Sequence, residues 1–203
     1  MVGDEIKITA ANRDLHSGMY GGLATNPIHV LSNILSLLYD KNGRITLEGF
    51  YDDVPELSNE QKEQWESLNF DAKEFLSNVG LSNIIGEKDY SPLEKIWSRP
   101  TCEVNGIWGG YTEPGFKTVL PSEASAKVSF RLVGKQDPNK VLKSFRNHVS
   151  KNLPSDCKVE FLAKAGSGAS SLEINSPEVK AAEKALHDEW NVSPKMVGCG
   201  GSI

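Results

Sequence analysis

The sequence predicts an α+β fold, a two-layer sandwich in which an antiparallel sheet carries two helices on one face. Segments that alternate apolar and polar residues predict the strands, and two segments with apolar residues at helical spacing lie between them. A polar stretch from about 52 to 100 interrupts this order and predicts a helical insertion. The order is strand, helix, strand, insertion, strand, strand, helix, strand, with split βαβ or ferredoxin-like character.

The first half of the chain contains one strand, one helix and a second strand. Residues 4–10 alternate, with Ile6 and Ile8 set against Lys7 and Thr9. Thr25 or Asn26 can cap the helix that follows, Pro27 suits its first position, and Asn42-Gly43 ends it. Residues 44–51 then read as a strand.

The insertion and the second half follow the same rules. Residues 58–68 and 71–79 predict short helices, the first of them capped by Ser58. Strands are expected at 101–107, 122–133 and 158–163, and a helix begins at Asp137-Pro138. The strand at 122–133 places one set of side chains on its apolar face: Ala124, Ala126, Val128, Phe130 and Leu132.

The last part of the chain has a different composition. Residues 164–175 are rich in Gly, Ser and Ala and predict a linker. A helix with apolar residues at helical spacing starts at Pro177, and residues 195–197 could begin one more strand before a Gly-Gly-Ser turn. We therefore expect the residues after about 170 to belong to a neighbouring domain.

Charge and hydropathy exclude two classes of partner. The net charge is −5 and the pI is about 5.5, and no basic stripe is interleaved with aromatic residues, so a nucleic-acid partner is not expected. The longest apolar stretch, 28–39, contains polar residues and is too short to cross a bilayer. No membrane association is expected either.

Cysteine and histidine spacing bears on location and metal binding. Cys102, Cys157 and Cys199 are an odd number of widely separated residues, which argues against a disulfide framework and favours a cytoplasmic protein. The four histidines lie singly, and no CxxC pair occurs. We expect no metal ligands in this chain.

The most informative motif surrounds His16, in the run Asp14-Leu15-His16-Ser17-Gly18-Met19-Tyr20-Gly21-Gly22. Glycine tolerates positive φ and lets backbone approach a ligand closely, so such a turn can hold an imidazole over a substrate. The alternative is a histidine that is simply satisfied within a Gly-rich turn. Asp14 either orients His16 or caps the turn.

Three separated segments carry a family resemblance: DLHSGMYGG from residue 14, NGIWGGYTEPGFKTVLPSEASAKVSFRLV from residue 105, and GGSI from residue 200. In this order and spacing they resemble the M20 zinc metallopeptidases, in particular the carnosinase-like dipeptidase branch. The resemblance implies that residues 1–170 form the lid or dimerisation domain, with the insertion at about 52–100. Residues 171–203 would then be a fragment of the catalytic domain.

The same resemblance implies a metal-dependent hydrolase that is larger than this chain. Two zinc ions in the parent enzyme would be held by residues outside the sequence, which would also supply the activated water and its base. The isolated chain is therefore expected to be inactive. The implied partners are a second copy of the chain, bound through the lid domain, and a dipeptide or short peptide substrate.

Site residues also follow from the resemblance. His16 would reach the active site of the other subunit and donate to the oxyanion, Thr118 would contact substrate, and Arg131 would clamp the substrate carboxylate. Gly201 and Ser202 would meet that carboxylate, and Asn105 is a candidate for lining the site. The alternatives are a turn-capping Thr118, a solvated Arg131, and an Asn105 that bonds its own backbone. Gly198-Cys199 replaces a common Arg-Glu, which leaves substrate preference open.

Two other functions fit parts of the sequence. One is a stand-alone protein-interaction module that dimerises through a sheet edge or a helix, without catalysis. The other is an acyl or thiol hydrolase that pairs Cys102 or Cys199 with a histidine, although no spacing indicates it.

Overall fold

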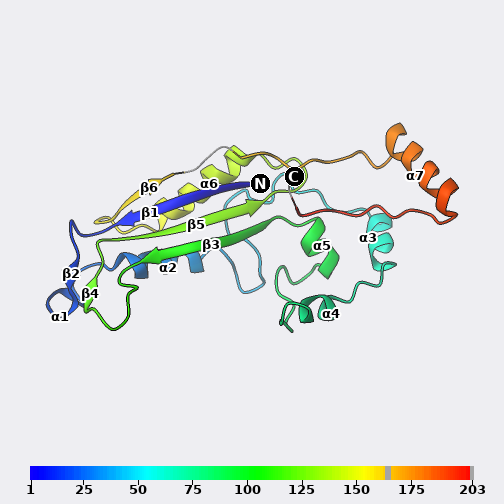
Figure 1. The fold of residues 1–203 in the computed structure, drawn as a ribbon. Coiled ribbons are helices and arrows are strands. Elements are labelled where there is room, and N and C mark those ends of the chain that lie inside the picture. Colours follow the sequence, from blue (N-terminus) through cyan, green and yellow to red (C-terminus); the bar gives the residue numbers. More distant parts are fainter. Residues whose placement is uncertain (163–165, 202–203) are drawn as a thin grey trace.

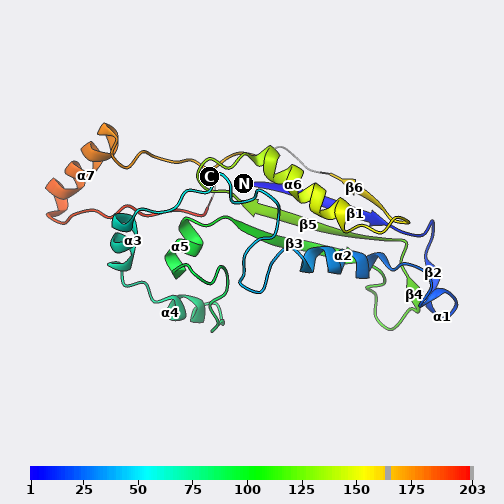
Figure 2. The same cartoon turned by 180° about the vertical axis from the view of Figure 1, so that it is seen from behind.

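A four-stranded antiparallel sheet forms the centre of the computed structural model, which describes residues 1–162 and 166–201 (Figure 1). The sheet order is β3-β5-β1-β6. These strands are β1 (Val2–Thr9), β3 (Thr101–Gly109), β5 (Glu123–Arg131) and β6 (Lys158–Phe161). Helices α2 (Pro27–Ser36) and α6 (Pro138–Lys151) cover one face of the sheet (Figure 2). The predicted two-layer α+β sandwich with split βαβ, ferredoxin-like order is confirmed.

The core lies between the sheet and these two helices, where the predicted alternation places it. Side chains that are at most 2% exposed come from β1, β5 and both helices: Ile6, Ile8, Ala126, Val128, Phe130, Leu31, Ile34, Phe145 and Val149. The ring of Phe130 meets that of Phe145 with centroids 5.4 Å apart. Removing this apolar surface from water is the main force that holds the two layers together.

The predicted caps explain where the two core helices begin. Asn26 Oδ1 accepts a hydrogen bond from Ile28 N at 2.9 Å, and Asp137 Oδ1 accepts one from Asn139 N at 2.8 Å. Each capping residue is followed by a proline at the first helical position, where its missing N–H costs nothing. Local sequence therefore sets both helix starts.

The strand predicted at residues 44–51 is wrong. Only one isolated bridge forms there, between Tyr39 and Ile45, and Gly49 at φ +67° turns the chain away from an extended course. Ile45, Leu47 and Phe50 are nevertheless buried. Their apolar character reflects burial of an irregular loop under α6 and not strand pairing.

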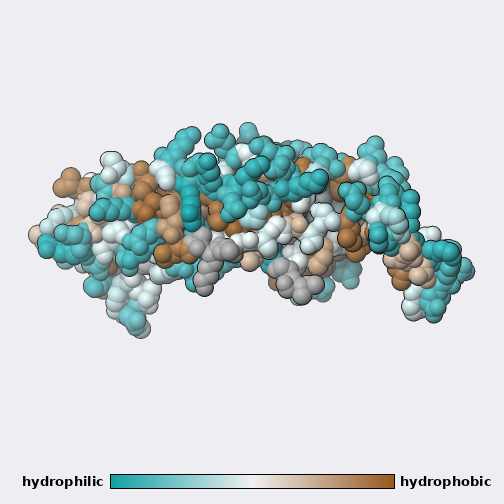
Figure 3. Space-filling view, turned by 90° about the horizontal axis from the view of Figure 1, so that it is seen from above, coloured by the Kyte–Doolittle hydropathy of each residue, from teal (hydrophilic) through white to brown (hydrophobic). Residues whose placement is uncertain are grey.

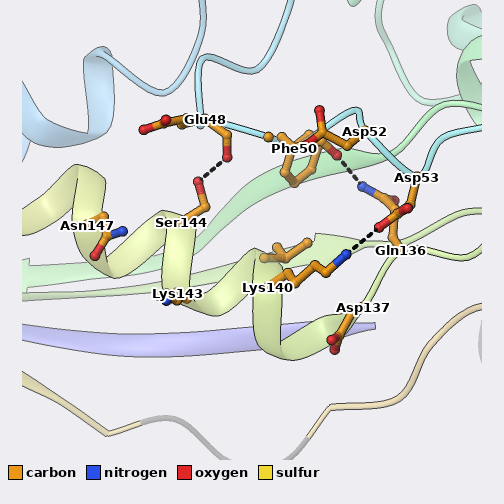
Figure 4. Close-up of a pocket in the computed structure, with 12 residues that line it drawn as sticks. Glu48, Phe50, Asp52, Asp53, Gln136, Asp137, Lys140, Lys143, Ser144 and Asn147 are labelled. Atoms are coloured by element: carbon orange, nitrogen blue, oxygen red, sulfur yellow. Dashed lines mark hydrogen bonds and ion pairs between the residues drawn. The ribbon is translucent and has the colours of Figure 1, made fainter.

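Three hydrogen bonds attach that loop to α6 and to the turn before it (Figure 4). Ser144 Oγ donates to Glu48 O at 2.6 Å, Gln136 Nε2 donates to Phe50 O at 2.7 Å, and Lys140 Nζ donates to Asp53 Oδ2 at 3.2 Å. They border a cavity of about 290 Å³. Because these bonds join the two segments that line it, we regard this cavity as structural.

The insertion contains three short helices, α3 (Asn59–Glu66), α4 (Ala72–Ser77) and α5 (Pro92–Trp97). The first two were predicted, and Ser58 caps α3 as expected by accepting from Gln61 N at 3.1 Å. Helix α5 was not predicted. The strand predicted at 195–197 is also wrong, because these residues form no strand.

A buried ion pair anchors the insertion. Arg99 donates to both carboxylate oxygens of Glu87, through Nε at 3.0 Å and Nη2 at 2.9 Å, and the two side chains are only 5% and 8% exposed. The guanidinium lies over the rings of Tyr51 and Tyr90, 5.0 and 4.1 Å from their centroids. Two aromatic faces and a bidentate carboxylate thus surround this cation.

Helix α7 (Pro177–Trp190) forms where predicted and extends away from the sheet (Figure 1). Val179 is its one residue in the buried class, and Leu186 and Trp190 are exposed. No helix within residues 1–162 and 166–201 combines the length and the apolar content that a membrane span needs.

Removing the buried cation should destabilise the protein strongly. We expect Arg99→Ala to lower the free energy of unfolding by about 3 kcal/mol, because the buried Glu87 would keep only its longer contact with Arg44 Nη1 at 3.4 Å. Urea titration measures this change. Lys184→Ala, which breaks an exposed pair within α7, is the control and should cost less than about 0.5 kcal/mol. Equal effects of the two substitutions would contradict the anchoring role.

Candidate functional site

A small structure at one end of the sheet carries His16. It consists of β2 (Leu15–His16), α1 (Ser17–Tyr20) and β4 (Val119–Leu120), and Figure 1 shows the three together beyond the end of β1. His16 pairs with Val119, and Leu15 pairs with Leu120. Segments that are about a hundred residues apart in the sequence therefore meet here.

The imidazole of His16 caps α1 with one nitrogen and leaves the other available. Its Nδ1 accepts from Gly18 N at 3.0 Å. A backbone N–H can only donate, so the neutral ring carries its proton on Nε2. A Cβ at residue 18 would lie 3.0 Å from His16 Cε1, which explains the glycine. The exposed end of the ring is therefore a hydrogen-bond donor.

Thr118 lies beside His16. Its Oγ1 is 3.4 Å from His16 Nε2, and its backbone carbonyl accepts from Ser17 N at 2.9 Å. The hydroxyl and the imidazole both face solvent. Two of the predicted site residues are thus brought together, and both present polar hydrogen-bonding groups.

Asp14 fixes the turn. Its Oδ1 accepts from Ser122 N at 2.9 Å and from Ser122 Oγ at 3.0 Å. The hydrogen bond from the Ser122 backbone, followed by the one from its side chain, lowers the pKa of the Asp14 carboxyl. Ser122 directly precedes β5. Of the two predicted roles of Asp14, these contacts favour capping the turn, and Ser122 is a partner that the sequence analysis did not identify.

A hollow of about 430 Å³ adjoins this end of the molecule. Its lining combines the glycines after α1, the start of α2 and one residue of β4: Gly21, Gly22, Leu23, Ala24, Thr25, Asn26, His29 and Leu120. Viewed from above, the end where Figure 1 places α1 shows both hydrophilic and hydrophobic surface (Figure 3). Met19 and Leu23, both exposed, belong to this part of the chain.

Arg131 lies at the opposite end of β5. It is the last residue of that strand and pairs with Thr101, the first residue of β3. Since β5 has nine residues and a strand rises about 3.4 Å per residue, its two ends are about 27 Å apart. Arg131 is therefore far from His16 and Thr118 within one copy of the chain.

The glycines near residue 200 lie toward the Arg131 end. A Cβ at Gly200 would be 3.1 Å from the carbonyl oxygen of Ile96, in α5, whose last residue, Trp97, precedes Thr101 by a short connection. Gly201 follows and is exposed. Ser202 lies outside the described residues.

Asn105 belongs to neither end. Val104 pairs with Val128 and Gly106 with Lys127, so Asn105 is the extra residue of a bulge in the middle of β3. Its side chain is exposed on the outer strand of the sheet. The structure does not bring it to the other predicted site residues.

Thiol and metal chemistry find little support in the described residues. Burial, followed by the charge of Glu103, raises the pKa of the Cys102 thiol to about 12, so this residue is not a thiolate nucleophile at neutral pH. Throughout residues 1–162 and 166–201, no three side chains of His, Cys, Asp or Glu are grouped so that they could hold a metal ion. These residues do not fit a zinc site.

The Asp14 contact predicts a pH dependence of the His16 turn. Because the folded pKa is lowered, the carboxylate stabilises the turn above its ordinary pKa of about 4, and this contribution is lost as pH falls through the lowered value. We expect hydrogen exchange of residues 14–22, corrected for intrinsic rates, to accelerate on acidification. Asp14→Asn keeps the accepting oxygen without titrating, so it should show a weaker acceleration. An identical pH dependence in the two proteins would contradict this role.

Comparison with curated proteins identifies dipeptidases as relatives. The chain is 30% identical to the Cys-Gly metallodipeptidase DUG1 of Candida albicans, covering 98% of this chain and 42% of that protein. It is 28% identical to the Beta-Ala-His dipeptidase of Rattus norvegicus, with 98% and 41% covered. The chain thus spans about two fifths of the length of these relatives.

Solved structures and a family match agree with that result. The M20 family metallo-carboxypeptidase Sso-CP2 from Sulfolobus solfataricus matches with a TM-score of 0.80 and 32% identity, over 99% of this chain and 46% of that one. Human carnosine dipeptidase 1 matches with a TM-score of 0.77 and 26% identity, over 100% and 44%. Residues 4–157 match the family described as a peptidase dimerisation domain. The chain belongs to this family, the dimerisation domains of the M20 peptidases.

Proposed function

We propose that this chain is the lid and dimerisation domain of an M20-type dipeptidase, and that each active site of the enzyme takes residues from two copies. One observation supports the proposal: four of the predicted site residues form two groups at opposite ends of β5. His16 and Thr118 make one group, and Arg131 and Gly201 make the other.

The separation of these groups is larger than the proposed substrate. The ends of β5 are about 27 Å apart, whereas an extended dipeptide spans about 7 Å. One substrate molecule cannot touch both groups of the same copy. A second copy, related by two-fold symmetry, can bring its His16 and Thr118 to the Arg131 of the first.

The outer edge of β3 offers a surface for such pairing. β3 is the end strand of the four-stranded sheet, so one side of its backbone has no neighbouring strand among the described residues. Val104, Ile107 and Trp108 along it are exposed. Open edges with apolar side chains are prone to pair with another chain, which supports a homodimer.

The side chains of this chain would bind the substrate and stabilise the negative charge that develops on it. The nucleophilic water would be activated by residues and metal ions outside this chain. We propose two zinc ions held by residues outside this chain, which when bound would activate a water. The Nε2–H of His16 suits donation to the oxygen that becomes negative as the peptide bond is attacked. The guanidinium of Arg131 suits bidentate binding of the substrate carboxylate, and the backbone of Gly201 can add a donor.

Substrate class and location are proposed from the relatives, the net charge and the cysteines. The dipeptidase names of the relatives support a dipeptide or short peptide substrate. A net charge of −5 disfavours nucleic acid as a partner, and we propose no membrane association. Cys102 and Cys157 are free and buried, which supports a reducing, cytoplasmic location.

The donor role of His16 can be tested in the full-length protein. We expect His16→Ala to lower kcat by about 100-fold, the effect of losing one oxyanion donor, while metal content stays unchanged. Hydrolysis of Cys-Gly and β-Ala-His measures it, and His187→Ala on exposed α7 is the control. Wild-type turnover in His16→Ala would overturn the proposed role.

Arg131 makes a different prediction. Arg131→Lys should raise KM for dipeptides with a free carboxylate, because a point charge cannot replace the planar fork. C-terminally amidated dipeptides lack the group that Arg131 would bind, so their already weak hydrolysis should change little. An equal loss with both kinds of substrate would show that Arg131 does not read the carboxylate.

A further inference from the structure

Side chains of α3 hold the segment that leads to Gly200. Its residue Met196 contacts Gln64 of that helix, which is 132 residues away in sequence. Met196 N donates to Gln64 Oε1 at 2.9 Å. Met196 O accepts from Trp65 Nε1 at 2.8 Å and from Gln61 Nε2 at 3.2 Å. Both backbone groups of Met196 are therefore bonded, as they would be by a neighbouring strand.

The three α3 side chains form one connected group. Gln61 Nε2 also donates to Gln64 Oε1 at 3.0 Å, and Gln61 and Trp65 lie one helical turn apart on the same face. Gln61 is 8% exposed and Trp65 is 7% exposed. Buried polar groups that are all satisfied fix one arrangement, because any shift would leave a donor or acceptor without a partner.

Helix α5 fixes the next residues by close contact. The ring of Trp97 meets that of Trp65 edge to face, with centroids 5.1 Å apart, and Lys62 pairs with Glu94 at 3.8 Å. A Cβ at residue 198 would lie 2.5 Å from Trp97 Cβ. Only glycine fits there, which gives a structural reason for Gly198 independent of any substrate contact.

Few other contacts restrain this part of the chain. Most described residues from 166 to 201 are exposed, and of α7 only Val179 falls in the buried class. Near its start, Ser167 N donates to Met1 O at 3.0 Å and Ser167 O accepts from the Met1 amino group at 2.6 Å. Nearer Gly200, the α3 contacts with Met196 and the α5 contacts with Gly198 and Gly200 restrain the described residues. α5 in turn continues into β3, whose first residue pairs with Arg131.

We propose that Gln61, Gln64 and Trp65 are positioning residues that hold Gly200 and Gly201 beside Arg131, so that backbone donors and the guanidinium meet the same substrate carboxylate. This inference rests on the proposed function for the identity of the ligand. It gives the helical insertion a role in substrate binding, whereas its polar composition suggests only a solvated surface.

Hydrogen exchange in the full-length protein tests the contact without relying on activity. Gln64→Leu removes the acceptor of Met196 N, and we expect exchange at that amide to rise about 10-fold. Gln64→Glu keeps an accepting oxygen and should restore slow exchange. Glu63→Gln, exposed on the same helix, is the control. Unchanged exchange in Gln64→Leu would overturn the inference.

Kinetics test the consequence for substrate. Trp65→Phe keeps an aromatic ring but loses the N–H, so we expect KM for dipeptides with a free carboxylate to rise about 2–10-fold, with kcat within about twofold of wild type. Circular dichroism confirms that each variant is folded. A fall in kcat at unchanged KM, or equal effects on amidated dipeptides, would overturn the positioning role.

The two proposals can fail separately. If wild-type protein cleaves no dipeptide, the proposed function fails, while exchange at Met196 still decides whether α3 holds the segment. If wild-type protein is active and Gln64→Leu changes neither exchange nor KM, the positioning role alone is wrong.

Discussion

The backbone pairing of β5 is the constraint on which the rest of the structure depends. This strand is bonded on one side to β1 and on the other to β3, in continuous antiparallel register except at the Asn105 bulge. Its buried face supplies the centre of the core, and its nine residues set a distance of about 27 Å between its ends. Because Ser122 holds Asp14 just before the strand and Arg131 ends it, the two groups of proposed substrate residues cannot approach each other in one copy. The strand thus makes dimerisation a geometric requirement of the proposed site.

In the proposed site, backbone and side chains at both ends of β5 would orient hydrogen-bond donors before substrate binds. Gly18 N fixes the tautomer of His16 by occupying Nδ1, and Gln64, Gln61 and Trp65 hold Met196. Donors that are already oriented need no reorganisation when charge develops on a bound substrate. Glycines at 18 and 198 permit these arrangements, because a Cβ at residue 18 would crowd the ring of His16 and a Cβ at residue 198 would crowd Trp97.

Local sequence predicted those features that local forces control. The alternation from Ala124 to Leu132, and the caps and prolines at Asn26 and Asp137, correctly predicted the central strand and the starts of both core helices. The predicted stop of the first helix at Asn42-Gly43 is wrong, because α2 ends at Ser36. Residues 44–51 misled because Ile45, Leu47 and Phe50 are buried in a loop, and burial alone does not distinguish a loop from a strand. Helix α5 was missed although its sequence carries a helix-start signal, in which Ser91 and Glu94 form a capping box and Pro92 is the first helical residue. The contact of Met196 with α3 could not be predicted, because a side chain that bonds backbone over a hundred residues away leaves no periodic mark. The pairing of His16 with Val119, which places Thr118 beside the imidazole, could not be predicted either, because it joins backbone segments about a hundred residues apart.

Mixing two inactive variants would test the shared active site most directly. The two full-length variants, His16→Ala and Arg131→Ala, would be mixed at equal concentration, unfolded and refolded together. Dipeptide hydrolysis by the refolded mixture would then be compared with that of each variant treated alone. In a mixed dimer, one site would receive both substitutions and the other neither. Random pairing under two-fold symmetry should then restore about one quarter of wild-type activity. No recovery, with mixed dimers present, would mean that His16 and Arg131 serve the same subunit's site and would contradict the two-copy arrangement.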